Sequence, residues 1–150
     1  MWKIKVNVRG ARHLPKMDAV GACDGFVKVK LGPHQTFQTK VVAKSFDPIW
    51  DESFELNCGG VHGHTLRLEV YDQDIQKFRK VHELVGCADV NLESMLHGHD
   101  GSQTAEDHTE AKTVHIQNRQ GDSCIGDDNM QTELDMSITV IGFDHVQAQQ

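Results

Sequence analysis

Apolar and polar residues alternate along most of this 150-residue chain. The apolar members of the four clearest stretches are Ile4, Val6 and Val8; Val27, Val29 and Leu31; Leu66, Leu68 and Val70; and Leu134, Met136, Ile138 and Val140. Successive side chains of a β-strand point to opposite faces of its sheet, so this alternation predicts strands with one buried and one wet face. Less regular stretches predict further strands around residues 36–42, 50–56, 84–91 and 111–117. The one helical turn that we expect is short and lies at 92–97.

About eight short strands, separated by clusters of Gly, Pro or Asp, predict an all-β protein folded as an antiparallel β-sandwich. A buried Val, Leu or Ile contributes roughly 1.5–3 kcal/mol, so shifting a strand by one residue would expose several such side chains. Residues 98–109 and 119–130 are polar and turn-rich, and we expect mobile surface loops there, far from the core. We expect a single domain over 1–150, with its core at about 2–142 and a tail at 143–150.

Composition narrows the class of protein. Apolar residues make up 38% of the chain and charged residues 25%, as in a soluble globular protein. No apolar run approaches the ~20 residues of a membrane span, and the first residues lack the apolar core of a secretory signal. The four cysteines form no Cys-x-x-Cys pair, which argues against a zinc ribbon or redox motif and favours reduced thiols in a cytoplasmic protein.

The net charge of −7 is unevenly distributed. The first 50 residues carry nine Lys or Arg against three Asp, whereas the remaining 100 carry six against nineteen acids. A uniformly basic surface for nucleic acid is therefore excluded. The charge distribution is compatible with a basic patch beside an acidic region that binds cations.

The acidic residues of most interest stand at the ends of predicted strands. Asp18 and Asp24 are six residues apart, Asp72 and Asp74 form an Asp-x-Asp pair, and Glu83 follows. A single Asp in a turn more often caps or solvates that turn. Carboxylates gathered in one place repel one another, however, and Ca²⁺ takes ~6–8 oxygen ligands, so two such pairs together predict a cation site.

Five segments, in this order and spacing, resemble the C2 domain family of protein kinase C, synaptotagmin and many membrane-trafficking proteins. They are residues 14–18, 23–29, 46–54, 68–74 and 83–86. The resemblance runs from about residue 3 to 92, with a last strand at 132–142. It implies an eight-stranded Greek-key sandwich whose loops at one end bind Ca²⁺ and then phospholipid. Because the strand at 132–138 resembles the one that the other topology places first, the chain is similar to the permuted, phospholipase-C-like form, called type II.

The resemblance also implies a set of metal ligands. These are the carboxylates of Asp18, Asp24, Asp72, Asp74 and Glu83 and the main-chain carbonyls of Met17 and Gln73. It implies two Ca²⁺ ions, within a range of one to three.

The third loop, from Asp72 to Glu83, is three residues longer than usual and ends in Glu rather than Asp, and Gly25 replaces the usual Pro. Five carboxylates with two Ca²⁺ would carry −1 rather than −5, so anionic lipid would be tolerated only after loading, and metal and membrane binding would reinforce each other.

The third loop is also the candidate for membrane insertion. Its apolar Ile75 and Phe78 are flanked by cations, each of which adds ~1 kcal/mol near an anionic surface. The residues expected at the membrane are Val20, Ile75, Lys77, Phe78, Arg79 and Lys80. The alternative is that Ile75, Phe78 and Val81, spaced by three, form a local cluster or helical turn.

Lys28, Lys30 and Lys40 lie on neighbouring predicted strands. In the family, lysines at matching positions form a phosphoinositide-binding groove with a fourth, which here is Gln38. The alternative is a solvated strand face whose lysines discourage edge pairing.

Catalysis has little support in the sequence. There is no Gly-x-Ser-x-Gly motif and no glycine loop for phosphate, and we name no catalytic residue. The histidine pairs His62/His64 and His97/His99 suggest zinc, but no further ligand completes a tetrahedral set, and a solvated surface explains them better.

We therefore expect a non-enzymatic signalling or trafficking module. It would bind anionic membranes containing phosphatidylserine in a Ca²⁺-dependent, peripheral and reversible way, with phosphoinositides and a protein partner left open. Two alternatives remain: a Ca²⁺-independent protein-interaction module on the same fold, and a metal-dependent hydrolase, since Asp clusters also bind Mg²⁺.

Overall fold

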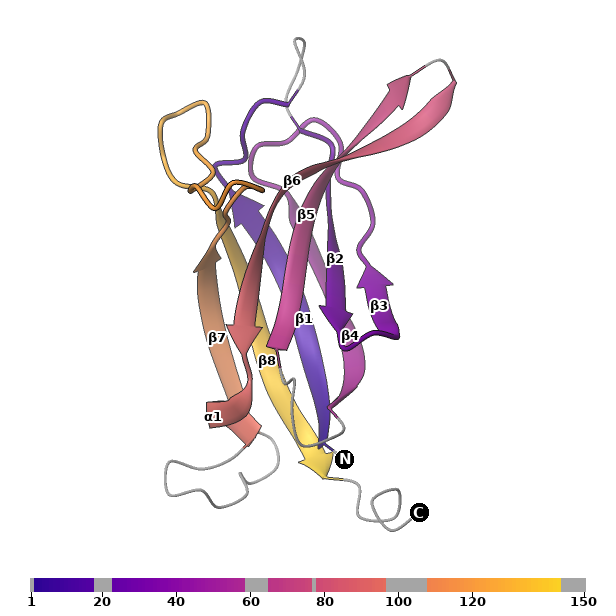
Figure 1. Ribbon diagram of the computed structural model, residues 1–150, viewed down its shortest axis with the longest axis vertical. Helices are drawn as coiled ribbons and strands as arrows, with labels where there is room; N and C mark the ends of the chain where they lie inside the picture. Colours follow the sequence, from indigo (N-terminus) through magenta and orange to yellow (C-terminus); the bar gives the residue numbers. More distant parts are fainter. Residues whose placement is uncertain (1, 18–22, 59–64, 77, 97–107, 144–150) are drawn as a thin grey trace.

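Two antiparallel four-stranded sheets pack face to face in the computed structural model, which describes residues 2–17, 23–58, 65–76, 78–96 and 108–143 (Figure 1). One sheet has the strand order β4-β1-β8-β7 and the other β3-β2-β5-β6. The strands are β1 (Trp2–Arg12), β2 (Gly25–Leu31), β3 (Gln35–Gln38), β4 (Ile49–Cys58), β5 (Thr65–Gln76), β6 (Arg79–Asn91), β7 (His108–His115) and β8 (Glu133–Phe143). A single helical turn, α1 (Glu93–Leu96), follows β6, as the sequence predicts. No helix in the described ranges is long and apolar enough to cross a membrane.

The topology confirms the predicted type II β-sandwich. The last strand, β8, lies between β1 and β7, and β1 in turn pairs with β4. The first strand of the chain therefore occupies the middle of its sheet and runs directly into the segment that carries the first acidic pair.

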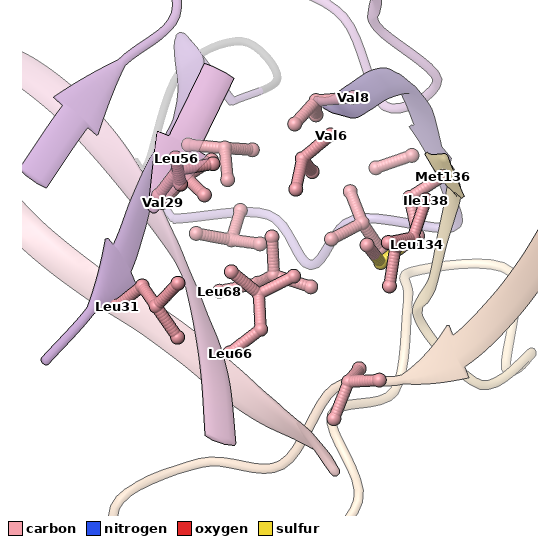
Figure 2. Close-up of a cluster of buried hydrophobic side chains, with 14 of the residues drawn as sticks. Val6, Val8, Val29, Leu31, Leu56, Leu66, Leu68, Leu134, Met136 and Ile138 are labelled. Atoms are coloured by element: carbon pink, nitrogen blue, oxygen red, sulfur yellow. The ribbon is translucent and has the colours of Figure 1, made fainter. Parts of the chain in front are cut away.

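The core consists of the apolar residues that alternate along the strands. Figure 2 shows members from both sheets meeting between them, among them Val6 of β1, Val29 of β2, Leu68 of β5 and Ile138 of β8. All four are completely buried. Trp50 of β4 is 2% exposed, and its indole N–H donates to the carbonyl oxygen of Gly25 in the opposite sheet at 3.0 Å.

The predicted strand at 36–42 is too long. β3 ends at Gln38, and pairing resumes only as an isolated bridge between Val42 and Gly25. The interruption has a local cause, because the Thr39 hydroxyl accepts the Val27 N–H at 2.9 Å while the Thr39 N–H donates to the Val27 carbonyl. Lys40 therefore lies beyond the strand, with its side chain exposed.

Residues 119–130, between β7 and β8, are mostly exposed, as expected for a surface loop, but the segment is not far from the core, because Cys124 within it is buried. Ile116 is fully buried, and Cys124 packs in the core cluster with its thiol donating to the Val85 carbonyl at 3.3 Å. Gln117 and Cys87 of β6 exchange two main-chain hydrogen bonds of 2.8 and 3.0 Å. This close approach requires Gly86, since a Cβ there would lie 2.5 Å from the Gln117 carbonyl oxygen. The expected loop at 98–109 lies outside the described residues up to 107, and residues 108 and 109 begin β7; the tail beyond 143 is likewise outside them.

Candidate functional site

One end of the sandwich gathers the residues that the sequence singles out. In Figure 1 the end of β1, the start of β2, the β5–β6 hairpin and residues 116–132 all lie at the top. The start of β1 and the end of β8 lie at the opposite end. The candidate site is therefore formed by the strand ends and connections at this end of the sandwich.

Asp24 and Asp72 meet at this end. Asp72 is completely buried, and its Oδ1 accepts the main-chain N–H of Asp24 at 2.8 Å. The Asp24 carbonyl accepts the Gln73 N–H at 2.8 Å, and Asp24 Oδ1 accepts the Lys44 N–H at 2.7 Å. The contact follows from the pairing of β2 with β5, which places Gly25 opposite Asp72. The predicted proximity of one acid from each pair is thus present.

The predicted third loop is a two-stranded ribbon instead. β5 and β6 remain paired from Asp72↔Glu83 out to Gln76↔Arg79. Directly opposed residues and residues two apart share a face of such a ribbon, so Asp72, Asp74 and Glu83 lie on one side of it. Asp74 Oδ1 accepts the N–H of its neighbour Ile75 at 2.8 Å. The additional residues of this segment extend the pairing of β5 with β6, so that Asp74 lies further along the hairpin than Asp72.

Within the described ranges, no three His, Cys, Asp or Glu side chains converge on a position that could hold a metal ion. Asp18, the fifth expected carboxylate, lies outside the described residues. Met17 is partly buried against the core. The candidate metal ligands are nevertheless all oxygen atoms, from carboxylates and from nearby main-chain carbonyls. Oxygen ligands suit a hard cation such as Ca²⁺.

The tip of the hairpin exposes its apolar side chains. Phe78 is fully exposed (104%) and has a left-handed backbone, with φ of 65°, while Ile75 is 69% exposed. Arg79 and Lys80 beside them are also exposed. The described residues of this tip therefore form neither a helical turn nor a buried local cluster. Lys77 and Val20, which were also expected at the membrane, lie outside the described residues.

The three lysines of the expected groove have different environments. Lys28 Nζ lies 4.8 Å from the centroid of the Tyr71 ring, a cation–π contact. Lys30 Nζ lies 2.8 Å from Oε1 of Glu69, which neutralises its charge. Lys40 is exposed beyond β3, with its main-chain N–H donating to Glu52.

Glu69 is the centre of a polar network on the outer face of this sheet. Besides Lys30, it accepts hydrogen bonds from Arg67 Nε at 2.9 Å and from the Tyr71 hydroxyl at 3.0 Å. Burial raises the pKa of Glu69, but the hydrogen bonds from Lys30, Arg67 and Tyr71 outweigh it and leave the pKa below its usual value. The hydrogen bond to Glu69 in turn raises the pKa of Lys30. Sequence reasoning missed Glu69, although its alternation with Leu68 and Val70 already placed it on the lysine face.

All four cysteines are free thiols, as the sequence predicts. Cys23, Cys58 and Cys124 are buried, and burial raises the pKa of Cys58 to about 11. These thiols are part of the packing, since three of the four lie inside the core cluster.

Comparisons with known proteins agree with this architecture. The model of the C2 domain family matches residues 2–107. The chain is 33% identical over 76 residues, 51% of its length, to multiple C2 and transmembrane domain-containing protein 2 of Mus musculus, and covers 8% of that protein. It is 35% identical over 98 residues, 63% of its length, to synaptotagmin-A of Diplobatis ommata, and covers 22% of it. The chain thus spans less than a quarter of the length of these relatives.

Among solved structures, a C2 domain of plant extended synaptotagmin 1 superposes with a TM-score of 0.70 and 23% identity, covering 96% of this chain and 97% of that one. Human GIVD cytosolic phospholipase A2 superposes with a TM-score of 0.67 and 22% identity, covering 95% of this chain and 16% of that one. At this identity the two superpositions establish the fold alone.

Proposed function

Because the chain belongs to the C2 domain family, a family with membrane-targeting members, we propose that it docks on anionic phospholipid membranes when Ca²⁺ is present. The observation that carries the proposal is the pairing of two features at one end of the sandwich. One is the contact between Asp24 and the buried Asp72, and the other is the fully exposed Phe78 at the hairpin tip. The attachment would be peripheral and reversible, from the cytoplasmic side, and would involve no catalysis.

The acids would hold the metal. Asp24, Asp72, Asp74 and Glu83 supply carboxylate oxygens, Asp18 completes the set, and the carbonyls of Met17 and Gln73 add main-chain oxygens. Bound Ca²⁺, two ions in our proposal, supplies positive charge that offsets the repulsion among these carboxylates. Asp72 is the principal ligand in this arrangement, because its carboxylate is buried beside the main chain of Asp24 and is already oriented.

The hairpin tip would enter the lipid. Full burial of a Phe side chain contributes roughly 1.5–3 kcal/mol, and each cation close to an anionic surface adds ~1 kcal/mol. Phe78 with Arg79 and Lys80 meets both conditions, and Ile75, Lys77 and Val20 would add to the contact. Lys28 and Lys40 would attract anionic headgroups along the adjoining face, with a smaller part for Lys30 because Glu69 neutralises it.

Phe78→Ala should weaken Ca²⁺-dependent binding to phosphatidylserine vesicles about tenfold, because it removes apolar area that is buried only in the membrane. Cosedimentation over a range of lipid concentrations measures the effect. Phe37→Ala removes the same side chain on β3, where it is 37% exposed and stacks on Phe54 at 5.5 Å; this control away from the hairpin should bind like the parent. Both variants should keep the parent's Ca²⁺-induced rise in melting temperature. Vesicle binding by Phe78→Ala equal to that of the parent would mean that the tip does not insert.

The rival function is a Ca²⁺-independent protein-interaction module. The observation in its favour is that the described acids do not already converge on a metal position. It predicts that neither vesicle binding nor the melting temperature depends on Ca²⁺. Cosedimentation with and without Ca²⁺ decides the first, and thermal unfolding decides the second.

A further inference from the structure

A groove of about 550 Å³ runs along the outer edge of β6, beside the base of the hairpin. One wall is the start of β6, with His82, Glu83 and Leu84, and the other is the turn at 118–120. The two walls are held together by the paired hydrogen bonds between Cys87 and Gln117. The groove therefore joins two segments that are more than thirty residues apart in the chain.

Arg119 places a cation in this groove that no acid in the described ranges neutralises. On the neighbouring sheet, by contrast, Lys30 and Arg67 share Glu69, and Arg67 also pairs with Asp89. The guanidinium of Arg119 makes no ion pair or hydrogen bond with any described residue, and its charge acts on Tyr71. Burial and the hydrogen bond to Glu69 raise the pKa of Tyr71, and the charges of Lys30 and, to a smaller extent, Arg119 partly offset that rise.

His82, on the opposite wall of the groove, is held by aromatic packing. Its ring meets Phe26 edge-on with 4.7 Å between centroids, and Phe26 stacks on Tyr71 at 5.4 Å. Phe26 is completely buried, so the His82 ring rests on a rigid base while its edge remains exposed.

The facing turn is equally well ordered. Asn118 Oδ1 accepts the main-chain N–H groups of Gln120 and Asp122, both at 3.0 Å. Gly121 follows with φ of 86°, a conformation that side chains disfavour. This closes a tight turn that holds Arg119 at the groove wall and orients the side-chain amide of Asn118.

The groove is rich in N–H donors. Arg119 carries a planar fork that matches phosphate bidentately, and His82, Asn118 and Gln120 add further donors. Glu83 is the single acid among the lining residues. It is also a proposed Ca²⁺ ligand, so metal binding would cancel the one charge that opposes an anion here.

We propose that this groove binds a phosphomonoester of a lipid headgroup, with Arg119 as the bidentate donor and His82 as the second contact. The inference rests on the proposed membrane docking, because the groove is lined by residues of β6 at the base of the hairpin whose tip carries Phe78. Figure 1 shows this β5–β6 hairpin projecting beyond the end of the sandwich. In this proposal, residues of β6 and of the turn at 118–120 select the headgroup. They lie on one side of Tyr71, and Lys28 lies on the other.

The test compares Arg119→Gln with Arg9→Gln, which makes the same charge change at an exposed position on β1 in the other sheet. Binding is measured in Ca²⁺ to phosphatidylserine vesicles, and to vesicles of equal surface charge in which phosphatidylinositol 4-phosphate replaces part of the phosphatidylserine. Arg119→Gln should weaken binding to the second kind about tenfold while binding the first kind as the parent does. Arg9→Gln should affect both kinds equally. Equal losses for Arg119→Gln on both vesicles, or no loss, would overturn the proposal.

Soluble inositol 1,4-bisphosphate separates this inference from the membrane proposal. Titration into the parent, followed by NMR of the Arg119 and His82 side chains, should give saturable shifts that Arg119→Gln abolishes. Shifts with the soluble headgroup but no binding to any vesicle would uphold the phosphomonoester groove, with a soluble source of the ligand, and reject the membrane proposal. Absence of shifts in the parent would reject the groove.

Discussion

Millimolar Ca²⁺ should raise the melting temperature of this chain by about 5–10 °C. A ligand present at 100 times its Kd stabilises the folded state by about 2.7 kcal/mol, and each kcal/mol is worth roughly 2–4 °C in a domain of this size. The unfolded chain cannot gather the acids, so the ion binds the folded state alone. Mg²⁺ should give a smaller shift, because it dehydrates reluctantly and prefers a smaller octahedral site.

Asp72→Asn should remove most of that shift. The side-chain oxygen that accepts the Asp24 N–H remains in this variant, whereas the buried negative charge is lost. Its stability without Ca²⁺ should therefore equal or exceed that of the parent. Asp89→Asn, which removes an exposed acid paired with Arg67, is the matched control and should keep the full shift. Thermal unfolding followed by circular dichroism measures both. A parent melting curve that Ca²⁺ leaves unchanged would contradict the metal site and favour the protein-interaction rival.

Trp50→Ala should cost about 3–5 kcal/mol of folding free energy, the largest effect of any single substitution that we predict. The indole is 2% exposed and fills the space between the sheets, and its N–H donates to the Gly25 carbonyl. Trp50→Phe keeps most of the packing but removes the indole N–H. The Gly25 carbonyl still accepts the N–H of Val42, so the lost hydrogen bond should cost about 1 kcal/mol, in addition to the cost of the smaller side chain. Urea denaturation measures both variants. A loss below about 1 kcal/mol for Trp50→Ala would mean that the indole does not link the sheets.

The strands were predictable because their signal is local. In β1, β2, β5 and β8 the alternation of buried and exposed residues follows directly from the pleat, and each strand lies where the pattern places it. Residues 116–132 have no such pattern. Their position depends on the main-chain pairing of Gln117 with Cys87 and on the burial of Cys124, contacts that join distant parts of the chain and that single-residue patterning does not contain.

The hairpin shows a different limit. The resemblance implied a loop from Asp72 to Glu83, but the residues between them pair in register as a ribbon. Ile75 and Val81 favour strand, and the polar residues around them hide the alternation, because both faces of a projecting ribbon are exposed to solvent.

The candidate site was predictable in part. The contact of Asp24 with Asp72 follows from two strands that pair, and the acids that end them were visible in the sequence. The ion pairing of the lysines could not be predicted, because Lys30 is neutralised by Glu69 of the neighbouring strand. Arg119 could not be predicted as a candidate, since its proposed role depends on the groove that it lines together with distant residues of β6.

The proposed function requires that Ca²⁺ binding and membrane binding strengthen each other. Isothermal titration of Ca²⁺ into the chain, with and without phosphatidylserine vesicles, measures this coupling directly. We expect the apparent Kd for Ca²⁺ to fall at least about tenfold when the vesicles are present, a coupling of about 1.4 kcal/mol. An equal Kd with and without vesicles, or no heat of Ca²⁺ binding in either, would contradict the account.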